Sequence, residues 1–270
     1  MPSATSVAPP KNAKEWHSPS FRPEDINALI LGVDRYNPSN VGFLEDYLQT
    51  QIENGQHDLF ANLAILKLHQ FNLNMINQRV VIDILLLALT SAPTIDSQDF
   101  NLALTLCLDR PPASLLQPNR DDYDDEDDMP STTDEVALVV PFLQKCWSLL
   151  RECRFRDFWQ CWKQEQGEGA ELIRSQYLPD HRHATSNLRL LIASTIASSF
   201  SSISVARLQR WLDFSSAEET KAFVEGVNGW KVSGDNVTID GNGDNDVKPS
   251  VIKEHVELKQ LSKIIGAAAV

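Results

Sequence analysis

Apolar residues recur at helical spacing along most of the chain, and short polar breaks separate the periodic runs. At "YNPSN" the residue before Pro38 is pushed out of the helical region, so one helix should end there. We expect Ser39 to cap the next helix, which has Val41, Leu44 and Leu48 on one face. The apolar stripe of the preceding helix consists of Ile26, Leu29, Ile30 and Val33.

The same spacing predicts further helices up to Phe200, and we find no strand signal before that residue. Asp58 is a plausible cap for residues 59–71, and Pro141 predicts a kink or a late start in the run at 134–155. The other predicted helices cover residues 74–91, 97–110, 156–166, 169–178 and 184–200. Because the helices alternate with short breaks and no strict sequence period, residues 21–180 are predicted to form an irregular helical-repeat domain, α-solenoid and HEAT-like.

The pattern changes after Phe200, where two predicted helices precede two short apolar runs. The first helix covers residues 201–214, and Ser216 with Glu219 forms a capping-box pattern at the start of the second. The apolar runs flank "SGDN" at 233–236, which indicates a hairpin. We therefore predict a winged-helix domain at 181–247 and a C-terminal helix at 248–270, which makes the whole chain mostly α.

Charge is distributed unevenly over the 270 residues, whose formal net charge is −13. In "DDYDDEDD", residues 121–128, seven of eight residues are acidic, and this block lies in a predicted surface loop at 111–133. The loop is interpreted as a solvated insertion, and the alternatives are a docking strip for a basic partner or an acidic mimic of nucleic acid. Residues 1–20 are rich in Pro, Ser and Ala and are predicted to be a disordered tail.

The cysteines and the hydropathy favour a cytoplasmic protein. No apolar run has the length of a signal peptide or of a membrane span, so no membrane association is expected. Four cysteines occur without a C-x-x-C pair, and we expect reduced, buried thiols. Cys146, Cys153 and Cys161 are spaced to share one face if they lie on one helix.

Motifs for catalysis or cofactor binding are missing, so we predict no enzyme activity, no cofactor and no metal. Neither phosphate-binding glycine pattern occurs, and no H-E-x-x-H motif exists. "DGNGDND" at 240–246 begins like a calcium loop, but Asn245 replaces the required glycine and Val251 the required glutamate, so we interpret it as a turn. His69 is predicted to be packed or partly exposed, and His181 and His183 would face different ways on a helix.

A winged helix raises the possibility of nucleic-acid binding, but the charges disfavour it. The expected recognition helix at 216–226 carries Glu218, Glu219 and Glu225 against Lys221 alone. Arg207 and Arg210 on the preceding helix are the candidate nucleic-acid contacts, and they can equally be a solvated face. Direct sequence-specific nucleic-acid binding is therefore not expected.

Four segments carry a resemblance to a known family: "GVDRYNP", "LEDYLQTQ", "DLFANLAILKLHQFN" and "FRDFWQCW". They resemble the k subunits of eukaryotic translation initiation factor 3, which belong to the PCI-type scaffolds shared with the proteasome lid and the signalosome. The resemblance covers roughly residues 24–240, and the tail, the acidic insertion and the "DGNGDND" loop depart from it. It implies a non-catalytic subunit that binds other subunits, most closely the l subunit. It also implies a contribution to small-ribosomal-subunit binding and preinitiation complex formation.

The predicted C-terminal helix is the candidate partner-binding segment. Val251, Leu258 and Ile265 recur every seven residues, with Leu261 beside them. A scaffold without catalytic motifs needs a partner surface, and the resemblance implies that the last helix joins a bundle shared between subunits; alternatively, the helix folds back on its own domain. Two further interpretations stay open: a winged-helix RNA-binding protein, and a PCI-type subunit of the proteasome lid or the signalosome.

Overall fold

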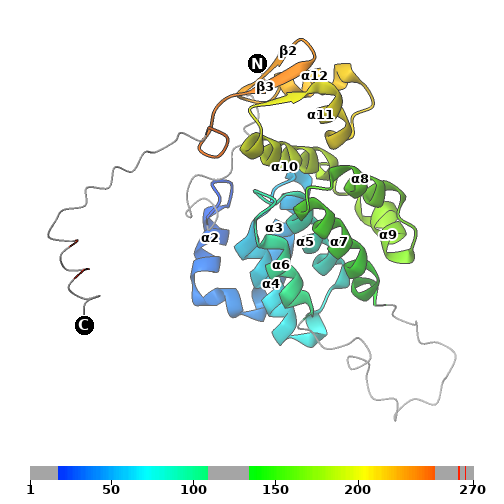
Figure 1. The fold of residues 1–270 in the computed structure, drawn as a ribbon. Coiled ribbons are helices and arrows are strands. Elements are labelled where there is room, and N and C mark those ends of the chain that lie inside the picture. The colour runs from blue at the N-terminus through cyan, green and yellow to red at the C-terminus, as the bar shows by residue number, and fades with distance from the viewer. Residues whose placement is uncertain (1–17, 109–133, 247–260, 262–264, 266–270) are drawn as a thin grey trace.

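The computed structural model describes residues 18–108 and 134–246, together with Leu261 and Ile265. Figure 1 shows a stack of helices with a small sheet and two short helices at one end. We call residues 18–108 and 134–199 the helical body, and residues 200–246 the winged-helix end. The predicted class, a mostly helical scaffold followed by a winged helix, is confirmed.

The helical body contains α-helices joined by short 3₁₀ and π turns. Before residue 109 the elements are α2 (Glu24–Leu31), η1 (Val33–Tyr36), η2 (Pro38–Asn40), α3 (Val41–Asn54), α4 (Leu59–Phe71), η3 (Leu73–Met75), α5 (Gln78–Thr90) and α6 (Asp99–Leu108). After residue 133 they are α7 (Glu135–Arg151), α8 (Phe155–Gln164), α9 (Glu168–Leu172), η6 (Ile173–Tyr177) and α10 (Ala184–Ser199).

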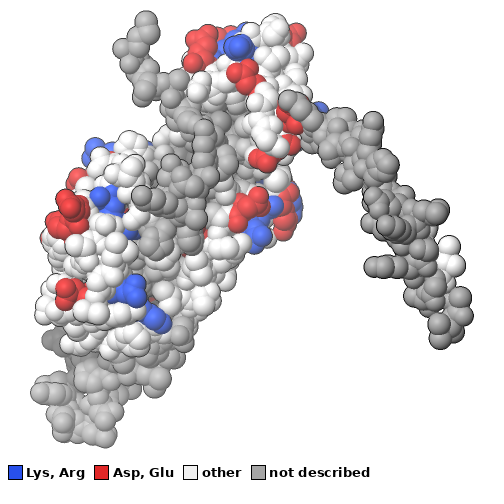
Figure 2. Space-filling model, turned by 90° about the vertical axis from the view of Figure 1, so that its left-hand side faces the viewer, with Lys and Arg blue, Asp and Glu red and all other residues white. Residues whose placement is uncertain are grey.

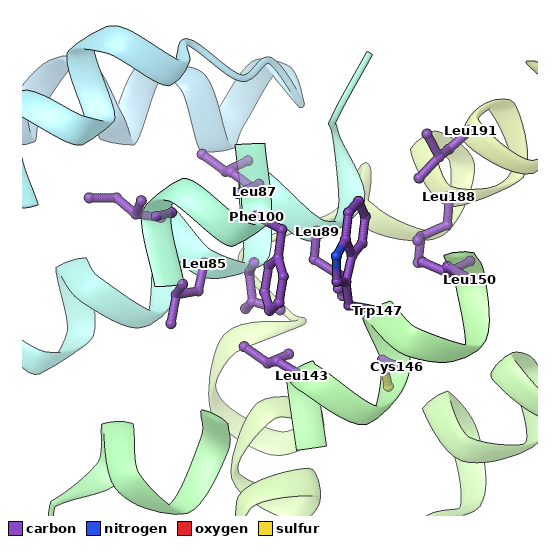
Figure 3. Packing of buried hydrophobic residues seen from close by; sticks show 14 of the residues in the cluster. Leu85, Leu87, Leu89, Phe100, Leu143, Cys146, Trp147, Leu150, Leu188 and Leu191 are labelled. Carbon is purple, nitrogen blue, oxygen red and sulfur yellow. The ribbon is translucent and has the colours of Figure 1, made fainter. Parts of the chain in front are cut away.

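Helix α5 lies at the centre of the helical body. Every residue from Val80 to Thr90 is buried, as expected for a helix that is apolar around most of its girth. It contacts α3, α4, α6, α7 and α10. Figure 3 shows its leucines facing Phe100 of α6 and Trp147 of α7, whose ring centroids lie 5.3 Å apart. One core therefore joins helices that are far apart in the sequence.

The turn at "YNPSN" is built differently from the prediction. The Asn37 side chain, not that of Ser39, provides the cap: it accepts a hydrogen bond from the Ser39 N–H at 3.0 Å, and η2 precedes α3. The expected place of Val33 in the apolar stripe is also wrong, because Val33 is 83% exposed. It lies in η1, after α2 has ended, so it no longer follows the 3.6-residue period of that helix.

Two predicted helix caps are present in the structure, and one predicted helix start is wrong. Asp58 caps α4 through the Ala61 N–H, and Ser216 Oγ accepts from the Glu219 N–H as predicted. The Glu219 carboxylate accepts from the Ser215 N–H, one residue before the position that a standard capping box uses. The predicted late start after Pro141 is wrong, because α7 begins at Glu135 and runs through the proline.

Two glycines allow close packing in the helical body. Gly55 ends α3 in the left-handed conformation (φ 62°), and a methyl group there would lie 2.4 Å from the His183 Cβ. At Gly169 in α9, a methyl group would lie 2.0 Å from the Leu138 carbonyl oxygen of α7. Glycine therefore lets α9 approach the α7 backbone more closely than any other residue would.

The winged-helix end contains β1 (Ser202–Ser204), α11 (Val205–Leu212), α12 (Ala217–Glu225), β2 (Trp230–Ser233) and β3 (Asn236–Ile239). The strands form an antiparallel sheet in the order β1-β3-β2. The hairpin around 233–236 is confirmed, with Gly234 at φ 60°. The helix expected from residue 201 instead begins at Val205, because residues 202–204 pair with β3.

Helix α10 lies between the two regions and contacts both α5 and α11 (Figure 1). The predicted domain boundaries at 20, 180 and 247 stay predictions, and the predicted loop at 111–133 lies outside the described residues. Among the described residues, no helix is long and apolar enough to cross a membrane.

Candidate functional site

The C-terminal end of α11 is where three helices meet. From α8, the Trp159 Nε1–H donates to the Trp211 carbonyl at 2.9 Å. From α10, the Arg189 guanidinium donates to the carbonyls of Leu212 and Asp213, both at 2.9 Å. We call this set of contacts the joint, because it fixes the winged-helix end on the helical body.

Two further contacts lie next to these hydrogen bonds at the joint. The Arg189 guanidinium lies 4.1 Å from the centroid of the Phe214 ring, and its burial lowers the pKa of Arg189. Asp213 has φ 55°, a left-handed conformation that ends α11, and its carboxylate pairs with Lys163 of α8. The joint therefore combines a stacked cation, an ion pair and three bonds to backbone carbonyls.

The outer face of α12 is acidic, as the sequence indicated. Glu218, Glu219 and Glu225 are exposed there, and Lys221 is the one exposed basic side chain of the helix. In the view of Figure 2, acidic and basic side chains of the described residues lie in small mixed groups and not as a continuous basic patch. The outer face of α12 therefore does not offer the cluster of cations that phosphate groups require.

The two candidate nucleic-acid contacts lie on the exposed face of α11. Arg207 stands 5.9 Å from the Trp211 ring centroid, and Arg210 Nε donates to the Ala206 carbonyl at 3.1 Å. Each arginine therefore contacts its own helix. Their role in binding nucleic acid remains a prediction.

The predicted partner-binding residues are only partly described. Val251 and Leu258 lie outside the described residues, whereas Leu261 and Ile265 are helical and 43% and 65% exposed. Their role also remains a prediction. A second set of exposed apolar side chains, which we did not predict, lies at the N-terminal corner and comprises Leu31, Val33, Tyr36 and Phe43.

The loop that begins like a calcium site forms a turn, as predicted, and holds the end of α10. Asn242 Nδ2 donates to the Ala197 carbonyl at 2.9 Å, and Asn245 Nδ2 donates to the same carbonyl at 3.0 Å. Asn242, a ligand position of the calcium pattern, is thus engaged within the protein, because its Oδ1 also accepts from the N–H groups of Asp244 and Asn245. Among the described residues, we find no group of three or more His, Cys, Asp or Glu placed to hold a metal ion.

Buried polar pairs, which the sequence did not reveal, connect distant parts of the helical body. Arg22 lies 2.6 Å from both carboxylate oxygens of Asp58, and both side chains are almost fully buried. His181 Nε2 lies 2.9 Å from Asp83 Oδ1 of α5, also in a buried position. Asp58 was recognised only as a cap, because spacing along the chain cannot identify a partner 36 residues away.

Three of the four thiols are buried as predicted, namely those of Cys107, Cys146 and Cys161. Cys153 is exposed, contrary to the expectation of buried thiols, and the last three cysteines do not lie on one helix. The chain turns between α7 and α8, with Cys153 at φ 55°, so Cys146 and Cys161 lie on two different helices. The packing of these helices still brings their sulfur atoms to 3.8 Å.

A model of the CSN8/PSMD8/EIF3K family matches residues 75–251, which include most of the helical body and the whole winged-helix end. Among curated proteins, the chain is 44% identical to "Eukaryotic translation initiation factor 3 subunit K" of Cryptococcus neoformans var. neoformans serotype D, over 98% of both chains. It is 35% identical to the protein of that name from Mycosarcoma maydis, over 95% of both chains. The protein of that name from Sclerotinia sclerotiorum is 31% identical, over 92% of this chain and 94% of its own.

Proposed function

The chain belongs to the CSN8/PSMD8/EIF3K family, and from this premise we propose that it is the K subunit of eukaryotic translation initiation factor 3. In this role it is a non-catalytic scaffold that binds other subunits and contributes to small-ribosomal-subunit binding and preinitiation complex formation. The observation that carries the proposal is the 44% identity over 98% of both chains to a protein of that name. Within the family, this match favours the translation factor over the proteasome lid and the signalosome.

The l subunit is the proposed direct neighbour, and two features of the chain are available to bind it. The described part of the sheet leaves the outer edge of β2 without a partner strand, and such an edge can pair with a strand of another chain. The second feature is the C-terminal segment with Val251, Leu258, Leu261 and Ile265, of which Leu261 and Ile265 are exposed. Membership in the initiation factor would place the chain in the cytoplasm, within a larger assembly.

Sedimentation of a tagged full-length chain from lysate, with mass spectrometry of the proteins that migrate with it, tests the proposal. We expect co-migration with other subunits of the initiation factor and with small ribosomal subunits, and the subunit contacts should persist after nuclease treatment. Migration alone, or with lid or signalosome subunits, would overturn the assignment to translation.

Substitution in the C-terminal segment tests the partner surface separately. The double variant Leu261→Glu, Ile265→Glu places charge on the two exposed apolar side chains and should reduce co-purification of the neighbouring subunit about 10-fold or more. Ser262→Glu adds charge at an adjacent position outside the apolar repeat and serves as the matched control. Equal recovery of the neighbouring subunit with both variants would show that Leu261 and Ile265 do not contact it. That result would not affect the proposal that the chain is a subunit of the initiation factor.

The RNA-binding alternative predicts a different dependence on salt. If Arg207 and Arg210 contact phosphates, RNA affinity should fall steeply as the salt concentration rises. The double variant Arg207→Ala, Arg210→Ala should then reduce the slope of log binding constant against log salt concentration by about 2. Since the outer face of α12 is acidic, we expect weak binding with no change of slope in the variant. A steep slope that the double variant flattens would instead support direct RNA binding.

A further inference from the structure

Cys146 of α7 and Cys161 of α8 form a pair of thiols at the contact between these two helices. Their sulfur atoms lie 3.8 Å apart, and the residues are 0% and 5% exposed. A disulfide bond needs the sulfur atoms at about 2.05 Å, so rotation of the two side chains must bring them about 1.8 Å closer. Figure 3 shows Cys146 beside Trp147 on α7, with its sulfur turned away from Phe100.

The surroundings of the two sulfur atoms differ, because Cys161 keeps 5% of its surface exposed and Cys146 keeps none. The hydrogen-bond contact with the Cys146 sulfur lowers the pKa of Cys161, the ammonium of Lys145 acts in the same direction, and burial opposes both. The same hydrogen bond, together with burial, raises the pKa of Cys146. Because the thiolate is the nucleophile, Cys161 is the sulfur that would react first with an oxidant.

Two solvent-exposed charged side chains lie next to Cys161. Lys145 Nζ lies 2.7 Å from Glu165 Oε1, and these side chains remain 52% and 34% exposed. The ion pair borders a groove of about 430 Å³ between α7 and the start of α9. Neither cysteine is part of the groove's lining, but Cys161, which is 5% exposed, interacts with Glu165 and so lies next to the groove.

We propose that Cys146 and Cys161 are a redox-active dithiol, which hydrogen peroxide converts into a disulfide that joins α7 to α8. The Cys161 thiolate attacks one peroxide oxygen, the O–O bond breaks, and the leaving hydroxide takes up a proton to give water and a sulfenic acid on Cys161. Cys146 then loses its proton and attacks the Cys161 sulfur, and the S–O bond breaks to release a second water. Two thiols and one peroxide thus give one disulfide and two waters, and a thiol reductant reverses the change.

Closure of this disulfide would act on the joint. Helix α8 carries both Cys161 and Trp159, and Trp159 donates to the Trp211 carbonyl of α11. A covalent bond between α7 and α8 therefore restrains the helix that supports the winged-helix end. This inference rests on side-chain geometry and does not depend on the proposed role in translation.

The test is oxidation of the folded, purified full chain with a small molar excess of hydrogen peroxide, followed by alkylation under denaturing conditions and mass spectrometry. We expect two alkylated cysteines instead of four, with a recovered peptide that contains the bond between Cys146 and Cys161. The oxidised protein should melt about 5 °C higher than the reduced protein, because the bond closes a short loop in the unfolded chain. Dithiothreitol should restore four alkylated cysteines and the original melting temperature.

Single substitutions separate this pair from the other thiols. Cys153→Ser should leave the disulfide unchanged, because Cys153 is not one of the paired thiols. The exposed Cys153 should itself react slowly, because partial desolvation and Asp96 raise its pKa. Cys146→Ser should leave a sulfenic acid on Cys161 that dimedone captures, whereas Cys161→Ser should leave Cys146 unmodified. Four alkylated cysteines after peroxide treatment of the wild-type chain, or oxidation confined to Cys153, would overturn the proposal.

Discussion

The helical body and the winged-helix end are held by polar contacts of different kinds. In the helical body, buried side chains pair with each other, as Arg22 does with Asp58. At the joint, Trp159 and Arg189 donate instead to backbone carbonyls of α11. A buried carboxylate that loses its partner either stays charged in an apolar environment or takes up a proton, and both cost free energy, whereas a carbonyl at the edge of the joint can bond to water. The two regions should therefore respond very differently to the loss of one donor.

Arg22→Leu should give the largest effect, because it leaves the Asp58 carboxylate without its counter-charge in a fully buried position. We expect the free energy of unfolding, measured by urea denaturation, to fall by about 3–5 kcal/mol. Arg154→Leu is the control: its ion pairs with Glu152 and Asp157 are exposed, and its loss should change stability little. An equal loss of unfolding free energy in the two variants would contradict the view that burial decides how much the loss of an ion pair destabilises the protein.

Arg189→Leu should give a smaller loss, confined to the joint. It removes two bonds to the carbonyls of Leu212 and Asp213 and should cost about 2 kcal/mol in a thermal or urea unfolding experiment. Limited proteolysis should then cut between α11 and α12 earlier than in the wild type. Arg182→Leu, a change of the same chemistry at an exposed position just before α10, should leave both measurements unchanged.

Asn245→Ala tests the weaker attachment of the turn at 240–246 to α10. The Asn245 amide reaches the carbonyls of Ala197 and Phe200, and its removal should cost about 1 kcal/mol. Asp244→Ala, in the same turn, should have no measurable effect on stability. Added calcium should leave the melting temperature unchanged, and a clear rise would show that the turn binds the ion.

The smallest effect should come from His69, a titratable group in the helical body. Burial lowers the pKa of His69, and Glu45, whose carboxylate lies 3.1 Å from Nε2, only partly opposes this. The unfolded state therefore binds a proton more readily than the folded state, so stability should fall as the pH drops through about 6.5. Between pH 7.5 and 5.5, the free energy of unfolding in urea should decline less for His69→Gln than for the wild type. Identical declines would argue against a lowered pKa of His69.

Features that depend on neighbours along the chain were predictable from the sequence. The cap at Asp58, the pattern at Ser216 and Glu219, and the hairpin at 233–236 each depend on residues within a few positions of one another. The long apolar runs likewise identified the buried helices. The mostly helical class with a winged helix followed from these local signals.

Features that depend on distant partners were not predictable. The three residues of β1 become a strand only because β3 lies beside them, and they are too short to carry a strand pattern of their own. Arg22 resembles an ordinary surface arginine until the fold brings Asp58 against it. The closeness of Cys146 and Cys161 depends on the angle between α7 and α8, which spacing along the chain cannot give.

The central position of α5 has a consequence for chain connectivity. Helices α6 and α7 stand on either side of residues 109–133, yet both pack on α5, and Phe100 meets Trp147 directly. The position of α6 relative to α7 is thus set by their contacts and not by the connecting segment. Doubling the length of that segment would cost only about 0.6 kcal/mol of loop-closure entropy. Residues 1–108 and 134–270, produced as separate chains, should therefore reassociate, which makes this segment the natural place for a split reporter or an inserted label.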